Sequence, residues 1–340
     1  MRIGIAMSGG VDSTACALLL QEHYQIQGFF MRLAQPDYAV QLERVQKISA
    51  AIGIKLKTID LRSEFRQRIL EYFSTSYFQC LTPNPCVVCN REVKFGLLLQ
   101  TILDQGMDKM ATGHYARITQ EKGSFSLKTG SDQKKDQSYF LCRLNQKQLA
   151  KTLFPLGTMT KEEIYSFVEE RGFTHFRGQE SQDVCFLGRG EINHFLDSQR
   201  SGPLADGDII KTDGTILGRH RGLYRYTIGQ RKGLGVAHPT PLYVIRLDPA
   251  NNRLIVGDKS ELFRDRIEVK ELHWLRGAPD NDKEYTVRIR YNHKGAMARV
   301  TTGEAGAGTL VFQEAQSAVT PGQFAVIYDH SELVGSGIIV

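Results

Sequence analysis

The feature that most constrains this chain is a short polar turn near its amino end. Ser8-Gly9-Gly10-Val11-Asp12-Ser13 directly follows the apolar run 3–7 and directly precedes the helix-like stretch 14–20. A strand that leads through a glycine-bearing turn into a helix points several backbone N–H groups at one place, where the helix dipole adds positive charge. Two adjacent glycines let an anion approach the main chain closely. The turn therefore predicts a phosphate-binding loop, in which the serines add hydroxyl donors and Asp12 orients a metal ion or an amide.

The two commoner nucleotide loops do not fit this turn. GxxxxGK[ST] needs a lysine that is absent here, and GxGxxG needs a different glycine spacing. The hexapeptide resembles instead the SGGxDS loop of the PP-loop ATP pyrophosphatases. That resemblance implies an enzyme that splits ATP between the α and β phosphates and uses the AMP half to activate a carbonyl oxygen.

Length and composition favour a soluble protein of more than one domain. The 340 residues are many for one hydrophobic core, so two or three domains are expected. No uncharged apolar run approaches the roughly 18 residues of a membrane span, and the amino end has no signal-peptide pattern. We therefore expect a cytoplasmic protein without a membrane partner. The formal net charge of +6 suits a polyanionic partner such as tRNA.

The first two hundred residues alternate between two kinds of pattern. Short β-branched runs predict strands at 3–7, 27–31, 55–59 and 109–112, and longer periodic stretches predict helices at 40–52, 63–77 and 93–105. Strands separated by helices predict an α/β domain with a doubly wound parallel sheet. Ligands of such sheets lie beyond the carboxyl ends of the strands. The loops after Met7, Met31 and Thr112 should therefore meet at one pocket.

The pattern changes from about Gly202 onward, where helical periodicity disappears. Short alternating segments follow at 243–247, 253–257, 285–291, 298–302, 308–312 and 323–328. Such segments, separated by turn residues, predict small antiparallel barrels. We expect a PP-loop catalytic domain at 1–200, a central β domain at 201–265 and a C-terminal β-barrel at 266–340.

Six cysteines stand at positions 16, 80, 86, 89, 142 and 185. Without an export signal they are expected as thiols rather than as a disulfide framework. Cys16 and Cys142 lie in apolar helical patterns and are expected in the core, and Cys80 has no distinguishing context. The other three stand in polar segments.

Cys86 and Cys89 follow the proline-containing stretch 82–85 and precede the predicted helix at 93–105. Cys89 is therefore expected near a helix N-terminus beside Arg91 and Lys94, a setting that lowers the pKa of a thiol. Cys185 lies in a second polar loop at 180–188. On the residues alone, a CxxC and a distant cysteine leave both a half-built zinc site and a redox pair open.

Further motifs extend the resemblance along the chain. They are TPNPCVVCNREVKF at 82–95, ATGHYA at 111–116, KKDQSYFL at 134–141, ESQDVCFLG at 180–188, YTIGQRKGLG at 226–235 and PGQ at 321–323. In this order, and with SGGVDS, they resemble the tRNA-specific 2-thiouridylase family. The resemblance implies an adenine nucleotide alpha hydrolase-like domain and two β domains that together hold the anticodon arm of tRNA. It also implies an AMP-forming reaction, with ATP and Mg²⁺, that replaces the 2-oxygen of the wobble uridine with sulfur.

The same resemblance implies site residues. Cys185 would carry a persulfide, loaded by a cysteine desulfurase or a sulfur-relay protein, and Cys89 would be the second thiol, which closes a disulfide with it. ATP would contact Ala6, Met7, Ser8, Gly9, Gly10, Val11, Asp12, Ser13, Met31 and Gly113. The target base would be bordered by Asn84, Pro85 and Cys86, and the RNA would be contacted by His114, Lys135, Asp136, Gln137, Arg290, Tyr291 and Gln323.

Three alternatives stay open. Some members of the family carry aspartate where this chain has Cys86, and the three cysteines Cys86, Cys89 and Cys185 could hold an iron-sulfur cluster that delivers sulfide. A PP-loop amidotransferase or ligase would adenylate a carbonyl without needing two cysteine segments. A pure RNA-binding module would bind tRNA and release no AMP.

The basic run of Arg219, His220, Arg221, Arg225, Arg231 and Lys232 has the density of a phosphate-contact surface.

Overall fold

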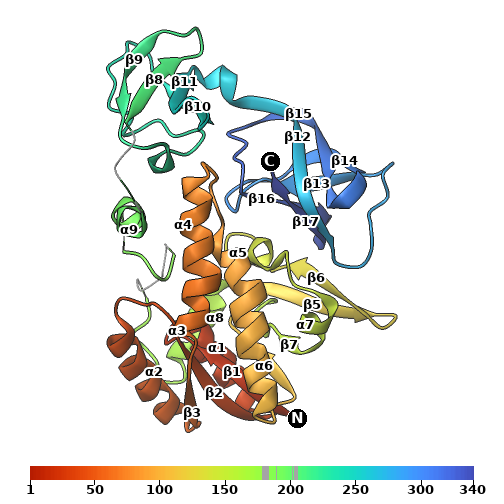
Figure 1. Ribbon diagram of the computed structural model, residues 1–340. Coiled ribbons are helices and arrows are strands. Elements are labelled where there is room, and N and C mark those ends of the chain that lie inside the picture. The colour runs from red at the N-terminus through yellow and green to blue at the C-terminus, as the bar shows by residue number, and fades with distance from the viewer. Residues whose placement is uncertain (178–183, 189, 201, 203–205) are drawn as a thin grey trace. The chain divides into compact units, whose positions relative to one another are not determined.

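The computed structural model describes residues 1–177, 184–188, 190–200, 202 and 206–340 (Figure 1). Contacts divide the chain into two compact units. The first comprises Met1–Leu70, Pro85–Gly190 and Ser331–Val334, and the second comprises Glu71–Asn84, Glu191–His330 and Gly335–Val340. Residues 180–183 of the second cysteine motif lie outside the described residues, whereas Cys185 lies within them.

A parallel sheet forms the centre of the first unit, with the strand order β3-β2-β1-β4-β7. Its strands are β1 (Arg2–Met7), β2 (Gln25–Arg32), β3 (Leu56–Asp60), β4 (Lys109–Ala111) and β7 (Thr152–Leu153). Neighbouring strands pair in parallel. The chain order reverses between β1 and β4, which is where sheets of this class bind ligands. The predicted doubly wound α/β sheet is confirmed.

Helices cover both faces of this sheet. On one face, Ile3, Ile5 and Met7 of β1 share a core with α1 (Val11–Gln21) and α2 (Tyr38–Ile52). On the other, a β carbon at Gly4 would lie only 2.4 Å from the side chain of Ile102 in α6 (Leu99–Asp104). The helix α8 (Lys161–Glu169) packs on α1. Because both faces are covered, the strand ends are the accessible part of the sheet.

The helices predicted at 63–77 and 93–105 both contain π-helical turns. The first runs through α3 (Arg62–Phe65), η1 (Arg66–Leu70) and α4 (Glu71–Phe78), and the second through α5 (Pro85–Cys89), η2 (Asn90–Leu98) and α6. The second run therefore begins at Pro85, earlier than predicted, because proline is well suited to a first helical position. The Gln148 side chain donates to the carbonyl oxygens of Arg91 and Phe95 at 2.8 and 3.0 Å. These hydrogen bonds give two backbone carbonyls of the π-helical stretch a side-chain partner.

An antiparallel hairpin that the sequence patterns did not indicate also belongs to the first unit. It joins β5 (Ala116–Glu121) to β6 (Ser124–Thr129) through Lys122 and Gly123, both at positive φ, the backbone that a two-residue hairpin turn requires. In the segment Ser331–Val334, Leu333 lies opposite Leu127 of β6, and both leucines are buried. The unit also contains η3 (Ser138–Leu141) and α7 (Gln146–Ala150).

The second unit is built mainly of antiparallel strands. After α9 (Ile192–Gln199), a small sheet has the order β10-β11-β8-β9, formed by β8 (Gly207–Lys211), β9 (Ile216–His220), β10 (Tyr243–Asp248) and β11 (Arg253–Gly257). A barrel follows with the order β12-β15-β14-β13-β16-β17, and β12 pairs back with β17 to close it. Its strands are β12 (Phe263–Trp274), β13 (Glu284–Arg288), β14 (Ala296–Thr302), β15 (Gly308–Ser317), β16 (Phe324–Asp329) and β17 (Glu332–Ile339). The expected β structures, the last of them a barrel, are confirmed.

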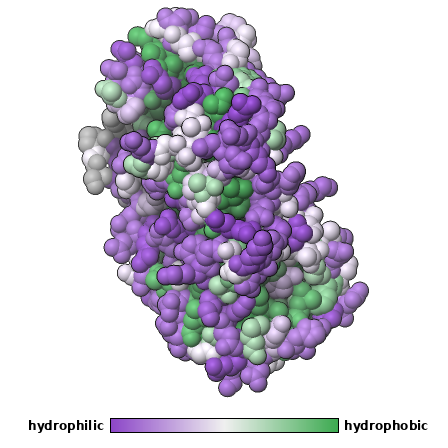
Figure 2. Space-filling view, turned by 90° about the vertical axis from the view of Figure 1, so that its right-hand side faces the viewer, coloured by the Kyte–Doolittle hydropathy of each residue, from purple (hydrophilic) through white to green (hydrophobic). Residues whose placement is uncertain are grey.

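On the face shown in Figure 2, hydrophilic residues predominate and apolar ones form scattered groups. Within the described ranges, no helix is both long enough and apolar enough to cross a lipid bilayer.

Candidate active site

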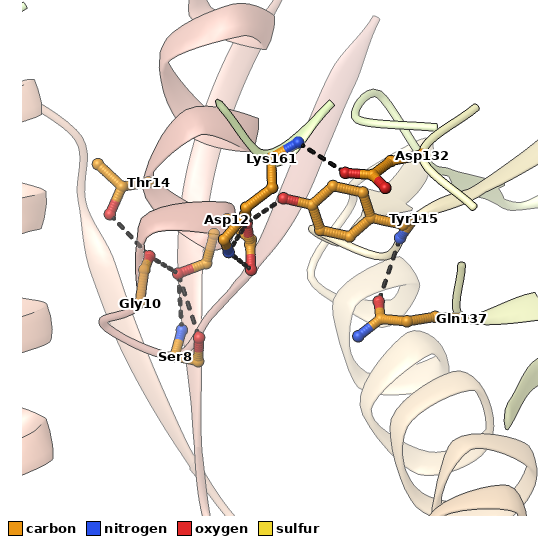
Figure 3. Close-up of polar contacts among 9 residues, drawn as sticks. Ser8, Gly10, Asp12, Thr14, Tyr115, Asp132, Gln137 and Lys161 are labelled. Atoms are coloured by element: carbon orange, nitrogen blue, oxygen red, sulfur yellow. Dashed lines mark hydrogen bonds and ion pairs between the residues drawn. The ribbon is translucent and has the colours of Figure 1, made fainter. Parts of the chain in front are cut away.

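The predicted strand-turn-helix is present at residues 8–13, between β1 and α1. Gly9 has φ +78°, a left-handed backbone that favours glycine. Ser13 Oγ accepts hydrogen bonds from the Ser8 amide at 3.2 Å and the Ser8 hydroxyl at 3.3 Å, and donates to the Gly10 carbonyl at 3.0 Å (Figure 3). The two serines therefore hold the turn in shape at the N-terminus of α1.

The loop after β4 meets this turn. A β carbon at Gly113 would lie 2.7 Å from the carbonyl carbon of Asp12, so only glycine fits there. Met31 follows Phe30, whose register partner in β1 is Met7. The residues expected to contact ATP, at 6–13, 31 and 113, thus lie at the carboxyl ends of adjacent strands, and their contacts with ATP remain a prediction.

The carboxylate of Asp12 is already occupied by two side chains that sequence reasoning missed. Lys161 Nζ donates to its two oxygens at 2.7 and 2.9 Å, and the Tyr115 hydroxyl donates to one of them at 2.6 Å. In Figure 3 both side chains point toward Asp12. The T-x-x-E pattern at 160–163 marks the start of α8 as a capping box, and the structure contains that box. No local pattern, however, indicates that the helix carries a partner for Asp12.

The three cysteines from the two motifs come together in the first unit. A charge on Cys185 raises the pKa of both Cys86 and Cys89, which places the thiols within electrostatic reach of one another. The Lys94 ammonium opposes this by lowering the pKa of each thiol. All six cysteines of the chain lie in the described residues and are free thiols.

The expectation of a lowered pKa at Cys89 is wrong. Burial raises the pKa of Cys89 to about 12 and that of Cys86 to about 11, and Lys94 only partly offsets this. Cys89 does not stand at a helix N-terminus, because the helical run begins at Pro85 and Cys89 ends its first segment. Desolvation also raises the pKa of Cys185, although that residue as a whole is exposed. Desolvation of the thiolate therefore outweighs the neighbouring cation.

His114 holds Lys94 in place beside the thiols. Its Nε2 lies 3.4 Å from Lys94 Nζ, and its Nδ1 lies 2.6 Å from the Thr112 hydroxyl. Burial, together with Lys94, lowers the pKa of His114 well below its usual value, so the ring is neutral near pH 7. A neutral ring can accept from the ammonium at Nε2. His114 is buried in the protein, so its expected contact with RNA stays a prediction.

The expected RNA-contacting residues of the first unit form an organised loop. The buried carboxylate of Asp136 accepts from the Gly130 and Ser138 amides, both at 3.1 Å, and Gln137 Oε1 accepts from the Tyr115 amide at 3.1 Å. Lys135 is half-buried in the same loop. Asp136 and Gln137 therefore shape the loop that carries Lys135.

In the second unit, Gln323 Nε2 donates to the carbonyl oxygens of Thr82 and Pro83 at 3.0 and 3.2 Å, directly before Asn84. Arg290 donates to the Ser317 carbonyl at 3.1 Å. Gln323 thus fixes the backbone that leads to the expected base-contacting segment. Tyr291 is half-buried next to Arg290.

Part of the basic run has structural partners. Arg225 pairs with Asp197 at 2.7 Å, and His220 is buried with Nε2 3.1 Å from the Asn252 carbonyl oxygen. Arg221, Arg231 and Lys232 are exposed. They remain the residues of this run best suited to an RNA phosphate.

The thiols do not have the arrangement of a metal site. Among the residues that the structure describes, no group of three His, Cys, Asp or Glu side chains could hold a metal ion. Cys86, Cys89 and Cys185 each carry a free thiol.

The pKa of Cys89 gives a testable pH dependence. Because burial holds this thiol protonated and alkylation needs the thiolate, we expect the rate of iodoacetamide labelling at Cys89 to rise about tenfold per pH unit from about pH 7 to about pH 10, without a plateau. Peptide mass spectrometry measures the rate. Lys94→Met should slow labelling further by removing the charge that favours the thiolate, whereas Lys94→Arg should not. A plateau reached below about pH 9 would contradict the burial effect.

The fold and the turn at residues 8–13 define a nucleotide-binding α/β protein of the PP-loop class. Family models match nearly the whole chain: a "tRNA methyl transferase HUP domain" at residues 1–189, a "tRNA methyl transferase PRC-barrel domain" at 193–258 and an "Aminomethyltransferase beta-barrel domain" at 264–339.

Curated relatives sharpen this assignment. A tRNA-specific 2-thiouridylase MnmA of Desulfotalea psychrophila is 51% identical over 338 residues, covering 99% of this chain and 98% of the relative. Proteins of the same name from Syntrophotalea carbinolica and Pelobacter propionicus are 42% and 39% identical, covering 98% and 100% of this chain and 97% of each relative. The chain belongs to the tRNA-specific 2-thiouridylase family.

Proposed function

We propose that this protein is a tRNA-modifying transferase that converts the wobble uridine of tRNA to 2-thiouridine in the cytoplasm. The observation that carries the proposal is the gathering of Cys86, Cys89 and Cys185 around Lys94, in the same unit as the turn at residues 8–13. An amidotransferase or ligase needs the turn but has no use for two cysteine segments. Membership of the 2-thiouridylase family supports the same choice.

The chemistry explains both parts of the site. A uracil carbonyl oxygen is a poor leaving group, so ATP bound at the turn adenylates it and releases pyrophosphate. Mg²⁺ brought in with the ATP phosphates would offset their negative charge. The terminal sulfur of a persulfide on Cys185 then attacks C2, and AMP departs with the former carbonyl oxygen. The Cys89 thiolate attacks Sγ of Cys185, which breaks the S–S bond and leaves sulfur on the base. The resulting Cys89–Cys185 disulfide is reduced by an external thiol, and a desulfurase or relay protein reloads the persulfide.

Cys89 must lose its proton before it attacks Sγ of Cys185. Burial opposes the loss, whereas Lys94 favours it. Because His114 is neutral, it accepts from Lys94 without cancelling the positive charge that favours the thiolates. We therefore assign Lys94 the role of stabilising the attacking thiolate.

The base must leave the anticodon stack to reach these thiols, at a cost of a few kcal/mol that protein contacts offset. In our proposal Asn84, Pro85 and Cys86 border the base. The RNA is contacted by His114, Lys135, Asp136, Gln137, Arg290, Tyr291 and Gln323. The catalytic domain spans 1–200, the central β domain 201–265 and the tRNA-contacting barrel 266–340.

A second route deserves a test because three thiols gather where the persulfide route uses two. In that route Cys86, Cys89 and Cys185 would hold an iron-sulfur cluster, although the described residues do not form a ligand set for it. Iron and labile sulfide are measured in anaerobically purified protein, beside AMP release and 2-thiouridine formation. An iron-free sample that thiolates tRNA when given a persulfide supports our proposal. Activity that disappears with the iron overturns the persulfide route, and AMP release without thiouridine overturns the thiolation itself.

A further inference from the structure

Asp12 places a negative charge at the very turn that would receive the phosphates of ATP. It is the second residue of α1, and its side chain is 32% exposed. Phosphate and carboxylate repel each other, and the repulsion grows with the number of phosphate charges. A phosphate-binding turn that contains an aspartate therefore needs a compensating cation.

Lys161 supplies that cation from a distant part of the chain. Its ammonium bonds both oxygens of Asp12 at 2.7 and 2.9 Å (Figure 3), and its side chain is only 12% exposed. A pair this sheltered from water is weakly screened, so its charges matter more than those of a surface pair.

The position of Lys161 is built from several sides. Its amide donates to Asp132 at 3.0 Å, and it follows Thr160, the N-cap of α8. Its ammonium lies 5.6 Å from the ring centroid of Tyr115 and 5.2 Å from that of Tyr165, within the range of cation–π attraction. These contacts fix the lysine at Asp12 before any nucleotide arrives.

We propose that Lys161 is a positioning residue of the nucleotide site: it neutralises Asp12 and so makes the turn at residues 8–13 able to accept a polyphosphate. The inference rests on the proposed ATP-dependent function. It predicts that the contribution of Lys161 scales with phosphate charge. Binding of ATP depends on it, whereas binding of adenosine, which has no phosphate, does not.

Calorimetric titration of the full chain with ATP and with adenosine tests this, in EDTA so that no metal bridges Asp12 and phosphate. Lys161→Met should weaken ATP binding by about tenfold or more and adenosine binding by less than about twofold. Lys161→Arg, which keeps the charge, should bind ATP like the wild type. Unchanged adenosine binding also reports that the variant is folded.

A charge rescue separates neutralisation from a general structural role. In the double variant Asp12→Asn with Lys161→Met, both the repulsion and its compensation are gone, so ATP affinity should recover to within about threefold of wild type. Asp12→Asn alone removes the repulsion and leaves the Lys161 ammonium free to attract phosphate, so it should raise ATP affinity above the wild-type value, which tests the idea even if Lys161→Met does not fold. Equal ATP affinity of wild type and Lys161→Met, or no recovery in the double variant, would overturn the inference. Wild-type binding of ATP only when Mg²⁺ is present would also overturn the inference, whereas no binding even with Mg²⁺ would mean that the proposed function fails instead.

Discussion

We expect that replacing Cys89 or Cys185 with alanine abolishes sulfur transfer to tRNA, lowering its rate by at least about a thousandfold. Each substitution removes a different sulfur atom from the proposed reaction. Without Cys185 no persulfide forms, and without Cys89 the bond between Sγ of Cys185 and the sulfur on the base is not broken. Affinity for tRNA should stay within about twofold, because neither thiol carries a charge at neutral pH. Mass spectrometry of digested tRNA measures 2-thiouridine, and filter binding measures affinity.

Matched cysteine variants make this result specific. Cys80→Ala removes a half-buried thiol of the second unit and should leave thiolation unchanged. Cys86→Ala should keep activity on the persulfide route and lose it on the cluster route. Retained thiouridine formation in Cys185→Ala would refute the assignment of the persulfide. AMP-forming turnover that is unchanged in Cys185→Ala, in a protein that forms no thiouridine, would instead support the ligase alternative.

The second large effect is expected from one methyl group at Gly113. In Gly113→Ala the new β carbon would lie 2.7 Å from the Asp12 carbonyl carbon and 2.8 Å from its β carbon. Neither atom can swing aside as a flexible side-chain end can, so the first turn of α1 must shift. A displacement of about 1 Å at a reacting site costs about a hundredfold in rate. Release of AMP and pyrophosphate from ATP should fall by that factor.

Gly303→Ala is the control for this substitution. Gly303 has φ −106°, and a β carbon there would lie 3.4 Å from its nearest neighbour, an ordinary contact. Thermal unfolding should be unaffected by Gly303→Ala, with ATP turnover retained. Wild-type turnover in Gly113→Ala would show that the turn tolerates displacement, and the close approach of the two loops would lose its proposed importance.

Local patterns were sufficient for the framework of the molecule. The parallel strands, the helices between them and the switch to antiparallel strands all follow from hydrophobic spacing within short windows. The glycine-rich turn could be located for the same reason, since strand, glycines and helix are contiguous. The approach of Gly113 to this turn follows from sheet topology, because loops after neighbouring parallel strands share an edge.

What the sequence left open depends on contacts between distant residues. The pairing of Lys161 with Asp12 joins two helices far apart in the chain, and no spacing rule connects them. The pKa of Cys89 was misjudged because the neighbouring cation is visible in the sequence, whereas the desolvation that outweighs it depends on the folded surroundings. The hairpin β5–β6 was overlooked because its two strands interrupt a region otherwise patterned as helix and parallel strand.

The residues Ser331–Val334 carry a consequence for how the protein is made. They belong to the first unit, where Leu333 is buried opposite Leu127. A ribosome synthesises the chain from its amino end, so β6 waits for this neighbour until residues 331–334 have emerged, after both β domains of the second unit have largely been made. Until then Leu127 and the free edge of β6 stay open to chaperones and to the edges of other nascent chains. Emergence of residues 331–334, rather than completion of residues 1–190, then sets the moment at which the nucleotide-binding part of the protein matures.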